Sequence, residues 1–152
     1  MLIYRREAFC SFRDELTPLL EKHWEEVAID KDTTPLDPDW SGYDLLERAG
    51  MLVCVTARAE DGRLVGYTSY TLTRHMHYNL QVADCGPFFL DPAFRKGLAG
   101  VNLFRAAEVV LKDLGVERVV HKVKLSHDVG RIFERMGYRP IERTYVKTLG
   151  GE

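Results

Sequence analysis

The sequence predicts an α/β domain whose sheet is largely antiparallel in its first half and built through crossovers in its second half. The expected elements run in the order of two helices, three consecutive strands, then helix, strand, helix and strand. Two β-branched and aromatic runs flank the dipeptide Asp61-Gly62, which supplies the positive φ of a tight hairpin turn. About four helices should therefore flank one mixed sheet. The chain has no repeats, linkers or low-complexity segments, so residues 1–152 are expected to form a single domain.

The N-terminal third is expected to contain one strand and two helices. Residues 1–6 alternate briefly, which is typical of an edge strand. Apolar residues recur at helical spacing over residues 12–28, and we place the start of this helix near Thr17, so that Pro18 takes the first helical position. A loop with several aspartates and prolines follows. Asp39 then caps a short second helix.

The rest of the chain alternates between strands and helices. Residues 51–75 form the hairpin, and the next strand, over residues 79–90, contains Gly86-Pro87, which indicates a bulge. The remaining expected elements are a helix over residues 101–115, a strand over 116–125, a helix over 126–137 capped by Ser126, and a final strand or strand pair over 138–149.

Composition indicates a cytoplasmic protein that uses neither a membrane nor nucleic acid. No apolar run approaches the roughly 18 residues of a membrane span, and the N-terminus lacks the apolar stretch of a signal peptide. The net charge of −2 argues against a nucleic-acid binder. Cys10, Cys54 and Cys85 lack the spacing of metal ligands, so we expect buried free thiols in a reducing compartment.

Charge is distributed unevenly along the chain. Residues 21–48 contain nine acidic and three basic side chains, whereas residues 115–149 contain eight basic and four acidic ones. Such a distribution suits a protein that meets a cationic partner on one side and an anionic partner on the other. Charge alone is equally compatible with solvated faces that have no binding role.

The most informative stretch is residues 88–104, FFLDPAFRKGLAGVNLF, in which an apolar strand runs into a glycine-bearing loop and then a helix. Loop and first-turn N–H groups converge on one point in such an arrangement, and the helix dipole adds partial positive charge. Gly97 and Gly100 allow a ligand to approach the backbone, and Arg95 and Lys96 add charges that suit a pyrophosphate. The stretch has neither the Walker pattern nor G-x-G-x-x-G, and a tight turn without a ligand stays open as an alternative.

The segment LDPAFRKGLAG, followed by an apolar helix, resembles the acetyl-CoA signature of the GCN5-related N-acetyltransferases (GNAT). The second hallmark of that family is a short helix that ends in Gly-Phe or Gly-Tyr, and SHDVGRIFERMGYRPIE is similar to it, so that the resemblance spans nearly the whole chain. It implies an antiparallel N-terminal half that splays from a parallel pair, with acetyl-CoA bound in the splay as co-substrate. EKHWEEVAIDKD, PDW and HMHY further resemble an uncharacterised branch that is common in bacteriophage genomes.

The resemblance also implies which residues contact acetyl-CoA. Backbone groups of residues 88–90 would bind the pantetheine arm in β-sheet fashion, and N–H groups of residues 95–100 would hold the pyrophosphate. The expected cofactor contacts are Phe88, Phe89, Leu90, Arg95, Lys96, Gly97, Leu98, Ala99, Gly100, Ser126 and Phe133.

The sequence departs from the family pattern at the positions that usually handle protons. Phe133 stands where many members carry the tyrosine that reprotonates the departing thiolate, and Gly86 stands where the strand often carries a carboxylate. The candidates that remain are Asp84 as general base, and His127 and Tyr138 as catalytic groups near the thiol. Each also has an interpretation without a catalytic role, as a strand-end, surface or core side chain.

Four residues are expected to contact the acceptor. His75 and His77 point one way along an extended chain beside Tyr78, and two ligands without a third do not make a metal site. We therefore predict substrate contacts there and no metal. Trp24 belongs to the N-terminal helices that usually wall the acceptor site in this family, and the acidic residues around it favour a cationic amine.

The sequence thus predicts an N-acetyltransferase in which a primary amine, on a small molecule or a protein, attacks the thioester of acetyl-CoA directly. One alternative is a CoA-binding sensor or interaction module that has lost turnover. Another is a protein-targeting acetyltransferase that acts on a host protein. The oligomeric state stays open, with a homodimer as one option.

Overall fold

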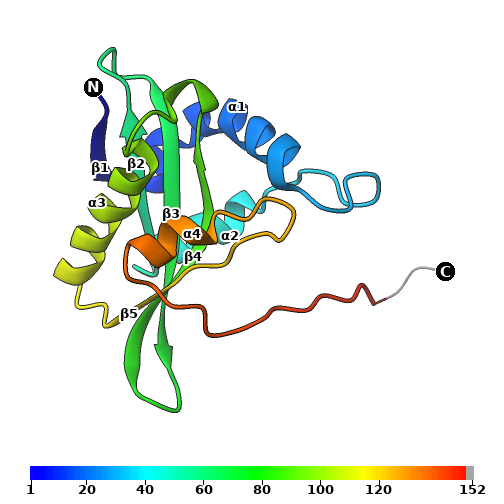
Figure 1. The fold of residues 1–152 in the computed structure, drawn as a ribbon, viewed down its shortest axis with the longest axis vertical. Helices are drawn as coiled ribbons and strands as arrows, with labels where there is room; N and C mark the ends of the chain where they lie inside the picture. The colour runs from blue at the N-terminus through cyan, green and yellow to red at the C-terminus, as the bar shows by residue number, and fades with distance from the viewer. Residues whose placement is uncertain (150–152) are drawn as a thin grey trace.

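The computed structural model of the protein describes residues 1–149, with a five-stranded sheet in the order β1-β2-β3-β4-β5 at its centre (Figure 1). Neighbouring strands from β1 to β4 are antiparallel, whereas β4 and β5 are parallel. This mixed sheet with its flanking helices confirms the predicted α/β fold class. In chain order, the elements are β1 (Ile3–Glu7), α1 (Phe9–Val27), α2 (Trp40–Arg48), β2 (Leu52–Arg58), β3 (Leu64–His75), β4 (Leu80–Leu90), a 3₁₀ turn (Pro92–Phe94), α3 (Ala99–Asp113), β5 (Arg118–Val120) and α4 (Gly130–Arg135).

Helices cover both faces of the sheet (Figure 1). On one face, α3 packs Leu103 and Leu111 against a core that includes Tyr70. On the other face, α1 packs Phe12 and Leu19 against a second apolar cluster around β2 and β3. The two clusters together bury the sheet, and removing this apolar surface from water provides the main driving force for the fold.

Helix α1 begins earlier than the sequence indicated. It starts at Phe9 and not near Thr17, so Pro18 lies inside the helix and not at its first position. Phe9, Phe12, Leu16 and Leu19 are buried along one side, whereas Pro18 is exposed. Packing of this long apolar side outweighs the helical hydrogen bond that proline cannot donate, a loss that falls on the solvent side where water can solvate the freed carbonyl group.

The hairpin and the second helix agree with the prediction. Strands β2 and β3 pair in antiparallel register, and Gly62 in the turn has a φ of +85°, which a residue with a side chain rarely adopts. The Asp39 side chain accepts a hydrogen bond of 2.9 Å from the Gly42 N–H group and caps α2.

The predicted bulge in β4 is confirmed. Tyr70 on β3 pairs with Cys85, but Thr68 pairs with Phe88, so Gly86 and Pro87 together stand opposite a single β3 residue. The extra residue shifts the alternation of side chains along β4. In a regular strand, Cys85 and Phe88 would face opposite sides of the sheet, because they are three positions apart. With the bulge between them, Cys85 belongs to the core beneath α3 and Phe88 packs against the same core.

The C-terminal third differs from the prediction in three ways. Strand β5 contains only three residues, Arg118–Val120. Helix α4 begins at Gly130, so Ser126 does not cap it, and the Asp128 side chain instead accepts a hydrogen bond of 2.7 Å from the Gly130 N–H group. Residues 138–149 contain no strand and extend away from the sheet (Figure 1). Their alternating pattern favours an extended chain, but a strand also requires a neighbouring edge to pair with.

The prediction of buried thiols is correct for two of the three cysteines. Cys54 and Cys85 are buried, and burial raises the pKa of each thiol to about 12, so both stay protonated at neutral pH. Cys10 is exposed, because it lies on the solvent side of α1 next to the buried Phe9.

Candidate active site

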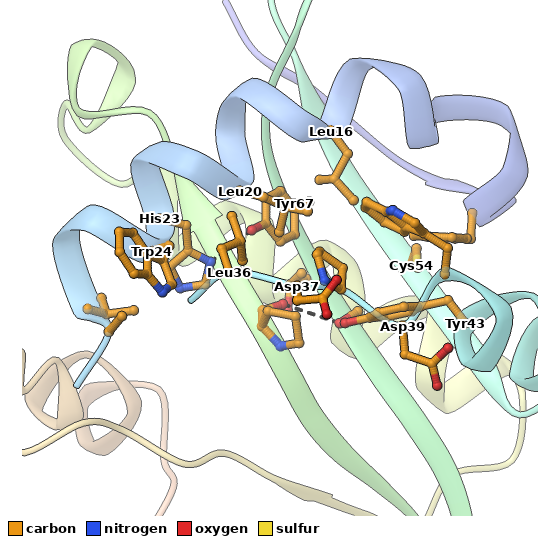
Figure 2. A pocket seen from close by; sticks show the side chains of 18 of the residues that line it. Leu16, Leu20, His23, Trp24, Leu36, Asp37, Asp39, Tyr43, Cys54 and Tyr67 are labelled. Atoms are coloured by element: carbon orange, nitrogen blue, oxygen red, sulfur yellow. Dashed lines mark hydrogen bonds between the residues drawn. The ribbon is translucent and has the colours of Figure 1, made fainter. Parts of the chain in front are cut away.

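A cavity of about 490 Å³ lies between α1, the segment over residues 28–39, α2 and the strands β3 and β4 (Figure 2). Figure 2 shows Leu16, Leu20 and Trp24 of α1 on one side and Tyr67 of β3 beside them. Leu36 and Asp37 of the connecting segment also line the cavity. A volume of this order fits a small molecule.

Aromatic rings form a large part of the wall. Phe9 and Tyr43 stack with ring centroids 4.9 Å apart, and Trp40 lies against both rings at centroid distances of 6.0 and 6.2 Å. Trp24 contributes a further ring from α1. These packed rings give the cavity rigid, flat and apolar sides.

His23 and Tyr67 place titratable groups inside the cavity. The Nδ1 atom of His23 lies 2.8 Å from the hydroxyl of Tyr67, and the imidazole stacks on Phe89 at a centroid distance of 5.3 Å. Burial lowers the pKa of His23 to about 4, while the charge of Glu26 opposes this shift in part. His23 is therefore neutral at pH 7. Burial also raises the pKa of Tyr67, which keeps its hydroxyl protonated.

An ion cluster joins three segments next to this pair. The Glu26 carboxylate of α1 accepts two hydrogen bonds from the Arg95 guanidinium, of 2.8 and 2.6 Å, and lies 2.9 Å from Nε2 of His127. The hydrogen bonds from Arg95 lower the pKa of Glu26, so the carboxylate is ionised at neutral pH. The cluster ties the loop after β4 and the loop after β5 to the end of α1.

The loop between β4 and α3 presents unpaired backbone donors. Gly97 has a φ of +56°, and α3 starts without a side-chain cap and without an acidic residue in its first turn. Within residues 1–149, no backbone carbonyl accepts a hydrogen bond from the N–H groups of residues 97, 98, 100 or 101. An anion is the natural partner for such a group of donors at the positive end of a helix.

The cavity reaches the point where β4 and β5 part. Their parallel pairing covers only Val82–Asp84 of β4, and the bulge at Gly86 and Pro87 follows directly. Pro87 and Lys124, the latter beyond the end of β5, both line the cavity. The gap between β4 and the chain after β5 therefore opens beside the part of the cavity that Pro87 and Lys124 line.

The structure does not bring the three predicted catalytic residues together. Asp84 lies on β4 before the bulge, pairs with the Lys122 amine at 2.7 Å, and does not line the cavity. His127 is part of the ion cluster on the α1 side. Tyr138 donates a hydrogen bond of 2.7 Å to Glu108 on α3, on the opposite side of the sheet. A catalytic role stays a prediction for each of them.

Of the predicted cofactor contacts, Phe88–Leu90 lie on β4 and residues 95–100 lie in the loop and first turn of α3, whereas Ser126 lies in the loop before α4 and Phe133 in α4 itself. Phe88 packs edge-on against Phe133, which is 5% exposed and stacks on His121 at a centroid distance of 4.1 Å. The Phe133 ring is thus part of the core. The Arg95 guanidinium is occupied by Glu26 and also donates to the Leu90 carbonyl at 2.6 Å, whereas the Lys96 side chain carries no ion pair within residues 1–149.

The predicted acceptor contacts separate into two groups. Trp24 lines the cavity. His75, His77 and Tyr78 instead form an aromatic group at the tip of the β3–β4 hairpin, where the His75 and Tyr78 rings lie 4.6 Å apart, and none of the three lines the cavity. Within residues 1–149, no three His, Cys, Asp or Glu side chains are placed to hold a metal ion.

Sequence reasoning missed His23 and Tyr67. A signal for His23 exists, because it follows Leu16, Leu19 and Leu20 by seven, four and three positions and so lies on the apolar side of α1. Tyr67 carries no such signal, since it lies in a strand whose seven residues from Leu64 to Tyr70 are all buried. Only the packing of α1 on β3 brings the two together.

Comparison with known proteins agrees with this geometry. The acetyltransferase (GNAT) family matches residues 11–138. No curated protein matches the chain by sequence. Among the part of the chain that the structure describes, no helix has the length and apolar character needed to cross a membrane.

Solved acetyltransferases share the fold at low sequence identity. An aminoglycoside acetyltransferase from an uncultured soil metagenomic sample, in complex with sisomicin, is 18% identical with a TM-score of 0.73, covering 99% of this chain and 95% of that one. The ribosomal-protein-alanine N-acetyltransferase of Brucella melitensis biovar Abortus 2308 is 15% identical with a TM-score of 0.75, covering 99% and 100%. The glucosamine-6-phosphate N-acetyltransferase of Arabidopsis thaliana is 14% identical with a TM-score of 0.72, covering 99% of both chains.

Proposed function

The chain belongs to the acetyltransferase (GNAT) family, and we propose that it transfers an acetyl group from acetyl-CoA to a primary amine by direct attack of the amine nitrogen on the thioester carbonyl. A C–N bond forms and the C–S bond breaks. The attacking amine loses a proton and the departing thiolate gains one, so the site needs a proton acceptor and a proton source.

The loop between β4 and α3 fits the pyrophosphate of acetyl-CoA. Its unpaired N–H groups lie at the positive end of α3, and a Cβ atom built on Gly97 or Gly100 would meet no atom within 4 Å, so the space in front of them is open. Lys96 adds a charge, while Arg95 holds the loop to Glu26. Acetyl-CoA supplies the acetyl group as an activated thioester.

The edge of β4 beyond the bulge fits the pantetheine arm. Pairing with β5 stops at Asp84, so within residues 1–149 the backbone groups that follow on this edge have no strand partner. An extended arm with amide groups matches the hydrogen bonds that such an edge offers. Phe88 and Leu90 then provide apolar contacts from the core side.

His23 is the proton acceptor that the cavity offers. Its imidazole is neutral at pH 7, and its Nδ1 atom contacts the Tyr67 hydroxyl, so a proton from the amine passes either directly to the ring or through Tyr67. Lys124 is exposed and also lines the cavity, and its positive charge favours the neutral, nucleophilic form of a nearby amine. Asp84, His127 and Tyr138 remain candidates for returning a proton to the thiolate.

One observation supports this proposal above the others. The cavity on the α1 side ends at Pro87, and the unpaired edge of β4 begins at the same bulge. A donor held along that edge and an acceptor held in the cavity therefore meet at one point of one strand. Proximity of this kind is a large part of how enzymes accelerate two-substrate reactions.

The test of the donor site is Gly97→Glu, measured as the dissociation constant of acetyl-CoA by calorimetry. A carboxylate beside the pyrophosphate should weaken binding about 100-fold, equivalent to about 2.7 kcal/mol of charge repulsion. Gly97→Ala is the matched control, because it carries the same backbone strain at a φ of +56° without the charge. Equal affinity in the two variants would show that the pyrophosphate does not lie at this loop.

The test of turnover is the release of free thiol from acetyl-CoA in the presence of a broad panel of primary amines. We expect release that depends on both substrates. Tight acetyl-CoA binding without thiol release on any amine would instead favour a CoA-binding sensor or interaction module. Labelling of a protein in a bacterial lysate by radioactive acetyl-CoA, with no small amine accepted, would favour the protein-targeting enzyme of a bacteriophage.

A further inference from the structure

We infer that the acceptor is a primary amine with an aromatic or branched apolar body, and not an amino sugar. The inference rests on the proposed function, because it names the substrate class of the same cavity. It also separates this protein from two of its structural relatives, which are named for aminoglycosides and for glucosamine-6-phosphate.

The walls of the cavity are suited to apolar groups. Trp24, Trp40 and Tyr43 contribute aromatic faces from two helices, and Leu20 and Leu36 close the space between them (Figure 2). Trp40 and Tyr43 pack against each other and against Phe9, so these rings offer a preformed surface for a flat or branched hydrocarbon group. The Lys31 ammonium lies 5.4 Å from the centroid of the Trp24 ring. The volume of about 490 Å³ accommodates a body of one or two rings.

Several polar groups of the lining are already engaged within the protein, whereas the side chains of Thr34, Asp37 and Tyr43 make no hydrogen bond within residues 1–149. The Ser69 hydroxyl donates to the Pro87 carbonyl at 3.3 Å, and the Thr68 hydroxyl lies 3.7 Å from the Cys85 sulfur. Tyr67 contacts His23, and Asp39 caps α2. A sugar would bury several hydroxyl groups in this cavity, and each hydroxyl without a hydrogen-bond partner weakens binding. An apolar body itself needs no hydrogen bonds from the lining.

Charge at the opening favours a cation. Asp37 is exposed on the segment that closes the cavity and forms no ion pair within residues 1–149, whereas the Glu25 carboxylate on α1 lies 3.5 Å from the Lys31 amine and does not line the cavity. The Asp37 carboxylate attracts an ammonium group. The Lys124 amine also lines the cavity, so an amino sugar is disfavoured by its hydroxyls and not by its charge.

Binding is measurable without catalysis, because both tryptophans of the chain line the cavity. Titration with 2-phenylethylamine should change the tryptophan fluorescence with a saturable curve, whereas glucosamine 6-phosphate at the same concentrations should not. Trp24→Phe keeps a ring at the wall and should retain binding within about threefold. Saturable binding of the amino sugar with the tighter constant would overturn the inference.

Steady-state kinetics with different amines then test the proposed substrate class. We expect kcat/KM for 2-phenylethylamine and 3-methylbutylamine to exceed that for glucosamine 6-phosphate and sisomicin by at least about 100-fold. Trp24→Ala should raise the KM for 2-phenylethylamine at least about tenfold, while Leu45→Ala, an exposed α2 position outside the cavity, should leave it unchanged. Efficient acetylation of the sugars, or of protein amines alone, would overturn the substrate class and leave the proposed transferase intact. Absence of thiol release with every amine would overturn the proposed function itself.

Discussion

His23 lies where the apolar side of α1 meets the cavity, stacked on Phe89 and 2.8 Å from the Tyr67 hydroxyl. A histidine in water titrates near pH 6.5, but burial lowers the pKa of this one to about 4. The ring is consequently neutral at every pH at which the protein is expected to work. Burial keeps one ring nitrogen unprotonated, but it also makes the imidazole a weaker base, so its role as proton acceptor depends on its position beside Tyr67.

We expect His23→Phe to lower kcat by about 100-fold or more, because a positioned proton acceptor typically contributes a factor of this size. Phenylalanine keeps the stack on Phe89, so acetyl-CoA affinity should stay within about twofold. Steady-state kinetics with 2-phenylethylamine, together with calorimetry for acetyl-CoA, measure the two effects separately. A kcat within threefold of the unchanged protein would assign the proton to another group.

Tyr67→Phe is the companion variant. It removes the hydroxyl and keeps the ring in a strand whose neighbours are buried. A loss in kcat comparable to that of His23→Phe would indicate a proton path through the hydroxyl. A loss below about fivefold would indicate direct transfer to the imidazole.

Helix α1 shows how one element depends on another. Ala8 directly precedes the helix, and its methyl group cannot accept a hydrogen bond from the N–H groups of the first turn. The Glu47 carboxylate of α2 takes that place, accepting hydrogen bonds from the N–H groups of Phe9 and Cys10. A carboxylate at the positive end of a helix stabilises it through both hydrogen bonds and the helix dipole. The two walls of the cavity are thereby fastened to each other at one end.

We expect Glu47→Ala to reduce the free energy of unfolding by about 1–2 kcal/mol, the usual effect of losing a helix cap. The KM for the amine should rise as well, because α1 and α2 form opposite walls of the cavity. Urea denaturation followed by circular dichroism measures the first effect. Leu45→Ala on the same helix, 62% exposed, is the control and should change stability by less than about 0.5 kcal/mol.

At the scale of the whole molecule, several buried groups make the fold sensitive to acid. Burial lowers the pKa of His121 to about 4, as it does for His23, and hydrogen bonds from the Arg58 guanidinium lower the pKa of Glu7 to about 2. Each folded-state pKa lies below that of the unfolded chain. Between the two values the unfolded chain binds more protons, so stability rises with pH. The histidines contribute between about pH 6.5 and 4, and Glu7 below about pH 4.5.

We expect the free energy of unfolding to fall by roughly 2–4 kcal/mol between pH 7.5 and pH 4.5, mainly because the two histidines resist protonation in the folded state. His121→Phe should remove about half of this decrease. It should also stabilise the protein at pH 7 by about 1 kcal/mol, since neither ring nitrogen of His121 has a hydrogen-bond partner within residues 1–149. Urea denaturation across this pH range is the measurement. An unchanged slope in the variant would contradict the assignment.

The proposed donor site could be predicted from the sequence because its residues are continuous along the chain. Strand, loop and helix follow one another within residues 88–104, and the chemistry lies in backbone N–H groups that Gly97 and Gly100 leave open. The bulge at Gly86 and Pro87 was readable for the same reason. Local residue types and local spacing were sufficient for these features.

The acceptor side was decided by tertiary structure. His23, Asp37 and Tyr67 come from a helix, a connecting segment and a strand, and only packing brings them around one space. Likewise, the pattern over residues 138–149 favoured a strand, but these residues form no strand and extend away from the sheet (Figure 1). The sequence by itself determined the α/β class, the elements of the sheet up to β4 and the glycine-bearing loop before α3, because these depend on short-range periodicity and turn chemistry. Helix starts, side-chain pKa values and the shape of the acceptor cavity depend on contacts between distant segments, and the tertiary structure alone decided them.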